Sequence, residues 1–179
     1  MGFVNFYKDN TTFVNSILDR SITEFVNNKI TQLGPYALCG CSITTLKSKT
    51  LKKTNNYSCM QCKNLKNVAL PVLTTAGYGC FKLCTALETF TGQSLSSILA
   101  ECFIDCENLT TVVLPNNSVV GLASINVFTR TPIADGTGYI YVPEALIDDY
   151  KTATNWVTYA EQFRTIEDYP EVLGVNGND

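Results

Sequence analysis

The chain contains no histidine among its 179 residues. This absence removes the commonest general base, the commonest nitrogen ligand of zinc and every catalytic triad built on imidazole. Serine is present, but Ser94 and Ser96 do not form a Gly-x-Ser-x-Gly nucleophile elbow, and no glycine-rich phosphate loop occurs. We therefore expect a protein that is not an enzyme and that binds no cofactor and no metal ion.

Long apolar runs are absent as well. Met1 to Phe6 contain no basic segment followed by a long apolar one, and no apolar stretch approaches membrane-spanning length. We expect a protein that is made in a reducing cytoplasm and does not contact a membrane. A cell-surface protein whose secretion signal lies outside this sequence is the alternative.

Acidic residues are missing from one large part of the chain. No Asp or Glu occurs between Glu24 and Glu88, and most acidic residues follow this segment. In a stacked fold, this distribution makes one end positive and the other negative, which suits either solvated faces or head-to-tail packing. The acid-free segment contains eight lysines: Lys29, Lys47, Lys49, Lys52, Lys53, Lys63, Lys66 and Lys82.

Four of these lysines fall in one predicted connection between a strand and the next coil. The simplest interpretation is a solvated loop, and the alternatives are contacts to an anionic glycopolymer or to a partner subunit. The sequence pI of about 5.0 argues against a nucleic-acid site. The candidate binding residues are Lys47, Lys49, Lys52 and Lys53.

The most prominent feature present is a repeat centred on one cysteine, which we call the anchor cysteine. It occurs at Cys41, Cys62, Cys84 and Cys106, at steps of 21, 22 and 22 residues. A period in the low twenties is typical of solenoids, in which each coil is too small to bury its own core. The sequence therefore predicts an α/β solenoid of about four to five coils.

Apolar residues recur at fixed distances from the anchor cysteines. Three residues after the cysteine stand Leu65, Leu87 and Leu109, while Cys59 occupies a position that other coils fill with Leu or Phe. A cysteine that alternates with Leu and Phe behaves as a small apolar residue. The predicted core seam consists of Cys41, Cys62, Cys84, Cys106, Leu65, Leu87 and Leu109.

The Cys59-x-x-Cys62 spacing also suits a zinc site, with Cys39 and Cys41 as further thiolates, or a redox pair. Stacked cysteines could also come within disulfide reach. We favour buried, reduced core cysteines over these two alternatives.

Each coil is expected to contain a short strand and a helical turn. The segments Leu65 to Pro71 and Leu109 to Pro115 read as strands that end at a proline. The residues just before each anchor cysteine suit a helical turn that lays small and aromatic side chains on the core. Strands of neighbouring coils are then expected to pair in parallel.

The predicted organisation has four parts: an N-terminal helix or anchor at residues 1–20, repeats at 21–134, an α/β cap at 135–170 and a loose tail at 171–179. The helix is expected from about Thr12, where the apolar spacing becomes helical. It would cover the first coil or join the chain to a homo-oligomer or another subunit.

The predicted cap is rich in aromatic residues. A strand near Tyr139–Val142 is followed by two expected helical pieces, which carry Tyr150, Trp156, Tyr159 and Phe163. Open sheet edges tend to recruit further strands. We therefore expect these aromatic side chains to cover the last coil.

The motif Cys-x-x-Leu-x-x-Val-x-Leu-Pro at Cys62–Pro71 and Cys106–Pro115 resembles BspA-like leucine-rich repeats, and Ile22–Leu46 looks like a first repeat of this type. Thr131–Asp168 is similar to the closing segment of such repeats in tail-associated proteins of phages and prophages of Gram-positive gut bacteria. This family has no catalytic residues to transfer. The resemblance implies a recognition scaffold, although a fold alone does not fix a function.

Three functions follow as hypotheses from these observations. The first is a virion-associated phage or prophage tail protein, made in the bacterial cytoplasm, that binds a host cell-surface protein or glycopolymer, or another virion protein. The second is a bacterial cell-surface adhesin domain. The third is a cytoplasmic protein–protein interaction module.

Overall fold

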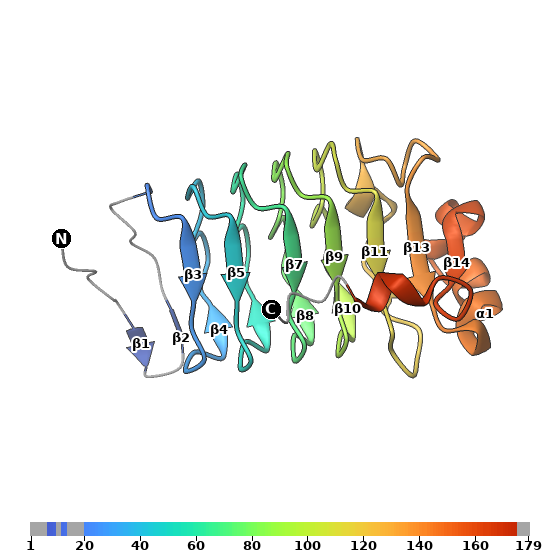
Figure 1. Cartoon of the computed structure of the whole chain (residues 1–179), viewed down its shortest axis with the longest axis horizontal. Helices are drawn as coiled ribbons and strands as arrows, with labels where there is room; N and C mark the ends of the chain where they lie inside the picture. The colour runs from blue at the N-terminus through green and yellow to red at the C-terminus, as the bar shows by residue number, and fades with distance from the viewer. Residues whose placement is uncertain (1–6, 10–11, 14–19, 175–179) are drawn as a thin grey trace.

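The computed structural model describes residues 7–9, 12–13 and 20–174, and within these the chain winds into a regular stack of coils (Figure 1). Each coil has a three-residue strand on one side, a two-residue strand on another and a run of tight turns on the third. The expected α/β solenoid with parallel strands is confirmed.

The two-residue strands form one sheet along the stack, the short-strand sheet. Its order is β1-β2-β4-β6-β8-β10-β12, and all neighbours from β2 onward are parallel, whereas β1 is antiparallel to β2. Its strands are β1 (Tyr7–Asp9), β2 (Thr12–Phe13), β4 (Gln32–Leu33), β6 (Lys53–Thr54), β8 (Thr75–Ala76), β10 (Ser97–Ile98) and β12 (Gly121–Leu122).

The longer strands form the opposite face, the long-strand face. Here β3 pairs with β5, and a five-stranded parallel sheet follows in the order β7-β9-β11-β13-β14. The strands are β3 (Glu24–Val26), β5 (Thr45–Lys47), β7 (Asn67–Ala69), β9 (Thr89–Thr91), β11 (Thr111–Val113), β13 (Tyr139–Val142) and β14 (Phe163–Thr165).

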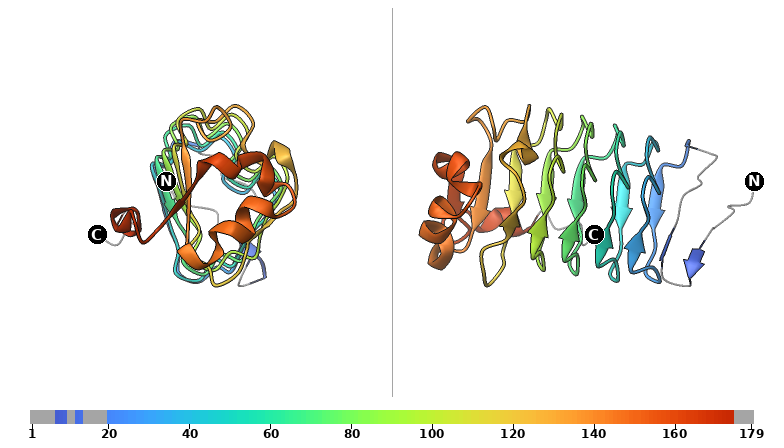
Figure 2. Two further views of the ribbon diagram at one scale, coloured as in Figure 1. Left: turned by 90° about the vertical axis from the view of Figure 1, so that its right-hand side faces the viewer. Right: turned by 180° about the vertical axis from the view of Figure 1, so that it is seen from behind.

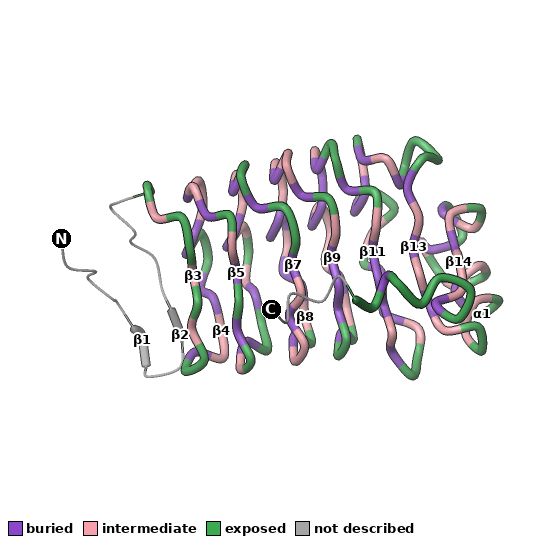
Figure 3. Tube along the Cα trace, in the orientation of Figure 1, coloured by how far each residue is buried: buried purple, intermediate pink, exposed green. Residues whose placement is uncertain are grey.

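The core lies inside the coils, and the central residues of β5, β7, β9 and β11 are buried in it (Figure 3). Val68, Phe90 and Val112 are in register in adjacent strands and are fully buried. Alternation along a strand places the residues on either side of each central residue on the outer side of the sheet. Two of these flanking residues, Thr91 and Val113, are nevertheless buried.

The turn side is linked by hydrogen bonds between coils. The amide of Leu38 donates to the carbonyl of Ser58 (2.7 Å), that of Cys59 to Cys80 (2.9 Å), and that of Phe81 to Cys102 (2.9 Å). Here the sequence predicts a helical turn, and the structure instead has tight turns. Some amides bond within the turn, as that of Cys41 does to the carbonyl of Leu38. A continuous helical series does not form, because alternate amides donate to carbonyls of the next coil.

A phenylalanine row runs through the core on this side. Phe81 and Phe103 stack with ring centroids 5.7 Å apart, and Phe103 and Phe128 stack at 5.6 Å, both nearly parallel. Phe128 belongs to the 3-10 helix η1 (Ile125–Phe128), so this helix continues the turn position of the earlier coils into a fifth one. Thr131 stands where an anchor cysteine would stand and is buried.

The C-terminal end of the stack is closed by a cap of short helices, seen end-on in Figure 2. The cap contains η2 (Glu144–Leu146), α1 (Ile147–Thr152) and η3 (Trp156–Gln162), followed by β14. The predicted helices and the strand before them are confirmed, with 3-10 geometry in η2 and η3.

Cap side chains replace the next coil as hydrogen-bond partners. Trp156 Nε1 donates to the carbonyl of Val120 (2.6 Å), and the Tyr150 hydroxyl accepts the amide of the same residue (3.0 Å). Asn155 Nδ2 donates to the carbonyl of Leu122 (2.7 Å), which ends β12. The predicted aromatic cover over the last coil is confirmed, and it also satisfies backbone groups of the open edge.

Two expectations about the ends need correction. At Thr12–Phe13, where a helix was expected to begin, β2 pairs in parallel with β4, because the edge of the first coil offers backbone partners that a helix cannot use. Residues 14–19 lie outside the described residues, and a homo-oligomer through residues 1–20 stays a prediction. The expected loose tail at 171–179 is wrong for residues 171–173, which belong to the 3-10 helix η4 (Pro170–Leu173) with Val172 buried.

Replacing Trp156 with Phe should test the cap. The variant keeps a ring but leaves the buried carbonyl of Val120 without its indole donor, which costs about 1–3 kcal/mol. The free energy of unfolding, measured with urea, should fall by that amount. The matched control is Val157→Ala, since Val157 is the next residue and is 58% exposed. Equal stability of W156F and V157A would contradict the assigned role of the indole.

Candidate functional site

The candidate lysines occupy one corner of the second coil, where the long strand β5 turns into the short strand β6. Lys47 ends β5, Lys53 begins β6, and Lys49 and Lys52 lie in the bend between them. All four are exposed. We call these four residues the lysine corner, and it lies at the edge of the stack where the long strands end.

The backbone of the lysine corner is fixed by local hydrogen bonds. Ser48 Oγ accepts the amides of Thr50 (3.3 Å) and Leu51 (3.1 Å), which closes the bend. The amide of Lys49 donates to Asn28 Oδ1 of the preceding coil (2.7 Å). The lysine side chains therefore project from a rigid turn.

The ion pairs among the described residues that can be assigned lie farther along the stack. Lys82 contacts Glu101 at 2.7 Å, Lys66 contacts Glu88 at 3.6 Å, and Arg130 contacts Asp105. These acidic residues all follow the acid-free segment that contains the lysine corner. The corner can therefore attract an anion with little repulsion from its own chain.

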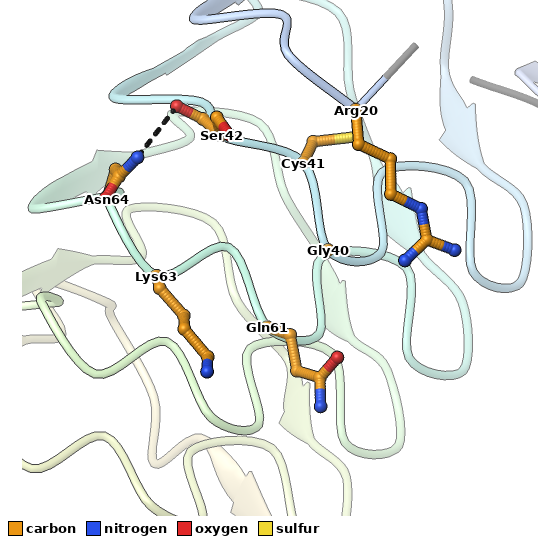
Figure 4. Close-up of a pocket in the computed structure, with 7 residues that line it drawn as sticks. All are labelled: Arg20, Gly40, Cys41, Ser42, Gln61, Lys63 and Asn64. Carbon is orange, nitrogen blue, oxygen red and sulfur yellow. Dashed lines mark hydrogen bonds between the residues drawn. The ribbon is translucent and has the colours of Figure 1, made fainter. Parts of the chain in front are cut away.

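A shallow pocket of about 220 Å³ lies at the other edge of the stack, where the long strands begin. Figure 4 shows the side chains of Arg20 and Lys63 on either side of Gln61, with the guanidinium beside Gly40. The pocket spans the first two anchor turns and is lined by Arg20, Gly40, Cys41, Ser42, Gln61, Lys63 and Asn64.

The anchor cysteines lie in the core, and their thiols make hydrogen bonds between coils. Cys62 Sγ donates to the carbonyl of Leu38 (3.1 Å), and Cys84 Sγ to that of Cys59 (3.2 Å). The thiol therefore supplies a donor as well as apolar volume, which the sequence pattern does not reveal. The structure buries all seven residues of the predicted seam: Cys41, Cys62, Cys84, Cys106, Leu65, Leu87 and Leu109.

The described cysteines are free thiols, and all but Cys39 are buried. Burial raises the pKa of Cys84 and Cys102, and the hydrogen bond that Cys59 donates to Cys80, together with burial, raises the pKa of Cys59. A protonated, buried thiol is neither a nucleophile nor a metal ligand. In residues 7–9, 12–13 and 20–174, no group of three acidic or cysteine side chains is arranged to hold a metal ion.

The repeat pattern matches a known family. The family described as BspA type leucine rich repeat region matches residues 9–133 in six copies, more than half of the chain. The chain belongs to the BspA-type leucine-rich repeat family. The match begins before Thr12–Phe13, so a repeat precedes the first anchor cysteine, in agreement with the pairing of β2 with β4.

A solved structure supports the same architecture. It is described as the crystal structure of the pneumococcal vaccine antigen PcpA, with 16% sequence identity and a TM-score of 0.55. The alignment covers 89% of this chain and 44% of that one. At this identity the likeness shows the fold alone. A comparison with curated protein sequences gave no match.

The long-strand face of this BspA-type stack is partly covered by its own C-terminal segment. Val172 of η4 and Ile166 pack on Val113 at the end of β11, and Tyr141 and Tyr169 meet edge to face at 5.5 Å. Figure 2 shows this segment leaving the cap to lie on the outside of the stack. The sequence signal was the apolar pair of Val172 and Leu173 shortly after Pro170.

A row of three tyrosines on the turn side was also not among the sequence predictions. Tyr36 stacks on Tyr57 with ring centroids 5.1 Å apart, and Tyr57 meets Tyr78 edge-on at 5.3 Å. The Tyr78 hydroxyl donates to Glu101 (2.5 Å). Their regular spacing of 21 residues in the sequence was the available signal.

Membrane insertion through a helix finds no support in the described ranges. None of their helices has the length and apolar character needed to cross a bilayer.

Thiol accessibility tests the placement of the cysteines. In native protein kept reduced, one of the eight thiols, that of Cys39, should react with Ellman's reagent, and all eight should react in denaturant. Cys39 should react more slowly than a free thiol because burial raises its pKa, an effect that Arg20 partly offsets. Cys39→Ser should abolish the native reaction. Rapid reaction of several thiols in folded C39S protein would contradict the buried seam.

Stability should fall at alkaline pH. Unfolded cysteines ionise near pH 8.5, while raised pKa values keep four buried thiols protonated in the folded state. Hydrogen bonds that Cys80 accepts from Cys59 and Ser58 outweigh its burial and lower its pKa, which offsets part of this effect. The folded state therefore binds more protons, and the free energy of unfolding decreases above about pH 8.5, by up to about 1.4 kcal/mol per pH unit for each thiol. The groups concerned are Cys59, Cys84, Cys102 and Cys106. Urea unfolding under reducing conditions at neutral and alkaline pH measures this slope, and a flat profile would contradict it.

Proposed function

We propose that this leucine-rich repeat protein is a non-enzymatic recognition module of a phage or prophage tail, and that its lysine corner binds an anionic polymer of the host surface. The observation that carries the binding role is the exposure of four lysines on one rigid bend in an acid-free part of the stack. The tail context rests on the resemblance of Thr131–Asp168 to the closing segment of tail-associated repeat proteins.

The geometry of the corner suits an extended polyanion. The bend joins two strands of the same coil, so Lys47 and Lys53 lie at its two ends, and Lys49 and Lys52 lie between them. Exposed ammonium groups keep their water and act as point charges, which favours a flexible chain of phosphates over a single shaped ligand. Such binding weakens with added salt because counterions screen exposed charges.

A cell-surface adhesin is the second candidate. It is favoured by the similarity in fold to a pneumococcal antigen. Both candidates place the lysine corner against a polymer outside the cytoplasm, so the location of the chain separates them. Detection by mass spectrometry in purified phage particles induced from the encoding bacterium supports the tail assignment. Its presence on intact cells and absence from the particles would favour the adhesin.

Binding to poly(glycerol phosphate), a defined anionic wall polymer, tests the lysine corner. Wild-type protein should bind the immobilised polymer at low salt and should not bind neutral dextran. Lys52→Gln combined with Lys53→Gln should weaken binding about tenfold or more, at about 1 kcal/mol per lysine near an anionic surface.

The matched control removes the same charge elsewhere. Lys66→Gln combined with Lys151→Gln also removes two lysines but leaves the lysine corner intact, and it should bind nearly as well as the wild type. Absence of binding by the wild type, or equal loss in both double variants, would refute the assigned role of the corner.

A further inference from the structure

A second feature, separate from the lysine corner, is the pocket at the edge of the stack where the long strands begin. It is bordered by the guanidinium of Arg20, the ammonium of Lys63 and the side-chain amide of Gln61, and no acidic side chain lines it. Within residues 20–174, neither Arg20 nor Lys63 takes part in an ion pair. Two cationic side chains and an amide thus line one pocket, with no counterion among the described residues.

The pocket is built around Gly40. This residue has φ +70°, and a Cβ placed there would lie 2.8 Å from Arg20 Nη1. The equivalent residue of the next coils, one before the anchor cysteine, is Gln61, Leu83 or Asp105, and each also has positive φ. The backbone conformation alone therefore does not demand glycine. A side chain at this position would instead displace the Arg20 guanidinium, which lies close to the Gly40 backbone.

Hydrogen bonds hold the two coils of the pocket together. The amide of Ser42 donates to the carbonyl of Arg20 (2.8 Å), which ties the start of the first coil to the turn after Cys41. Asn64 Nδ2 donates to the carbonyl of Ser42 (3.4 Å), which ties that turn to the second coil. The backbone that positions Arg20 is thus linked directly to the turn that contains Lys63.

We infer that this pocket binds an oxyanion of the phosphate class, either a free phosphate or one phosphodiester of a larger molecule. Guanidinium and ammonium groups form charge-assisted hydrogen bonds to phosphate oxygens, and an amide adds a neutral donor. The openness of the pocket lets a diester enter with its two substituents in solvent. The site lies where the long strands begin and the lysine corner lies where they end, so it does not depend on the proposed function.

Titration with inorganic phosphate and with dimethyl phosphate, followed by backbone amide NMR at constant ionic strength, tests this inference. Both anions should shift the amide signals of Gly40, Ser42 and Asn64 in a saturable way. Inorganic phosphate represents the free ion and dimethyl phosphate the diester. Saturation by dimethyl phosphate identifies a site that a phosphodiester polymer can use, and saturation by inorganic phosphate alone identifies a free-phosphate site.

Three variants and one control make the test specific to the pocket. Arg20→Gln and Lys63→Gln should each weaken binding roughly three- to tenfold, as expected for one charge-assisted hydrogen bond at an exposed site. Gly40→Ala keeps both charges but displaces the guanidinium, and it should weaken binding similarly. The control Lys66→Gln removes a charge three residues from Lys63, outside the pocket, and should bind like the wild type.

Thermal unfolding of each variant verifies that the fold is retained. Two results would overturn the inference: no saturable shift with either anion in the wild type, or equal affinity of K63Q and K66Q. Loss of wall-polymer binding in the lysine corner variants would leave the phosphate affinity unchanged, so the two proposals fail independently.

Discussion

Hydrogen bonding between equivalent positions of successive coils is the constraint on which the rest of this structure depends. Both sheets and the turn side use it, from the strand pairs to the amide of Phe81 on the carbonyl of Cys102. A buried backbone group without a partner is costly. Every coil must therefore place its backbone donors and acceptors opposite those of the neighbouring coils. This is the reason why a 21-residue coil and 22-residue coils share one register: Leu46 still pairs with Phe25, and the shortening is confined to the turn after Cys41.

The same constraint explains the cysteines. A small side chain fits inside the turn, and its thiol donates to the carbonyl one coil earlier, as Cys106 does to Phe81 (3.1 Å). Leu or Phe could fill volume there, but neither could donate. The anchor cysteines, which repeat most visibly in the sequence, therefore connect successive coils. Binding sites are expected instead where the sequences of the coils differ.

The differences between coils lie mainly at the two edges of the long-strand face. The lysine corner belongs to one bend, since the corresponding bends of later coils carry Pro71 and Gln93 at the position of Lys49. The cationic pocket belongs to the first two anchor turns. Of the residues just before the four anchor cysteines, Gly40 is the one without a side chain, and Arg20 lies close to its backbone. Both sites lie in the first two coils, and the acidic residues gather at the other end, so the charge asymmetry of the sequence becomes an asymmetry along the stack.

The sequence by itself determined the period, the coil architecture, the aromatic cap and the burial of the anchor cysteines, because these follow from spacing and from which residues share a position. It also marked the four lysines, since they lie within seven residues of one another. It did not determine β2 or η4, because a two-residue strand such as Thr12–Phe13 and a short helix such as Pro170–Leu173 form only when a sheet edge or a surface such as Val113 is already present. The pocket was hidden for the same reason: Arg20 and Lys63 are far apart in the chain and meet only because one turn of the solenoid brings successive coils side by side.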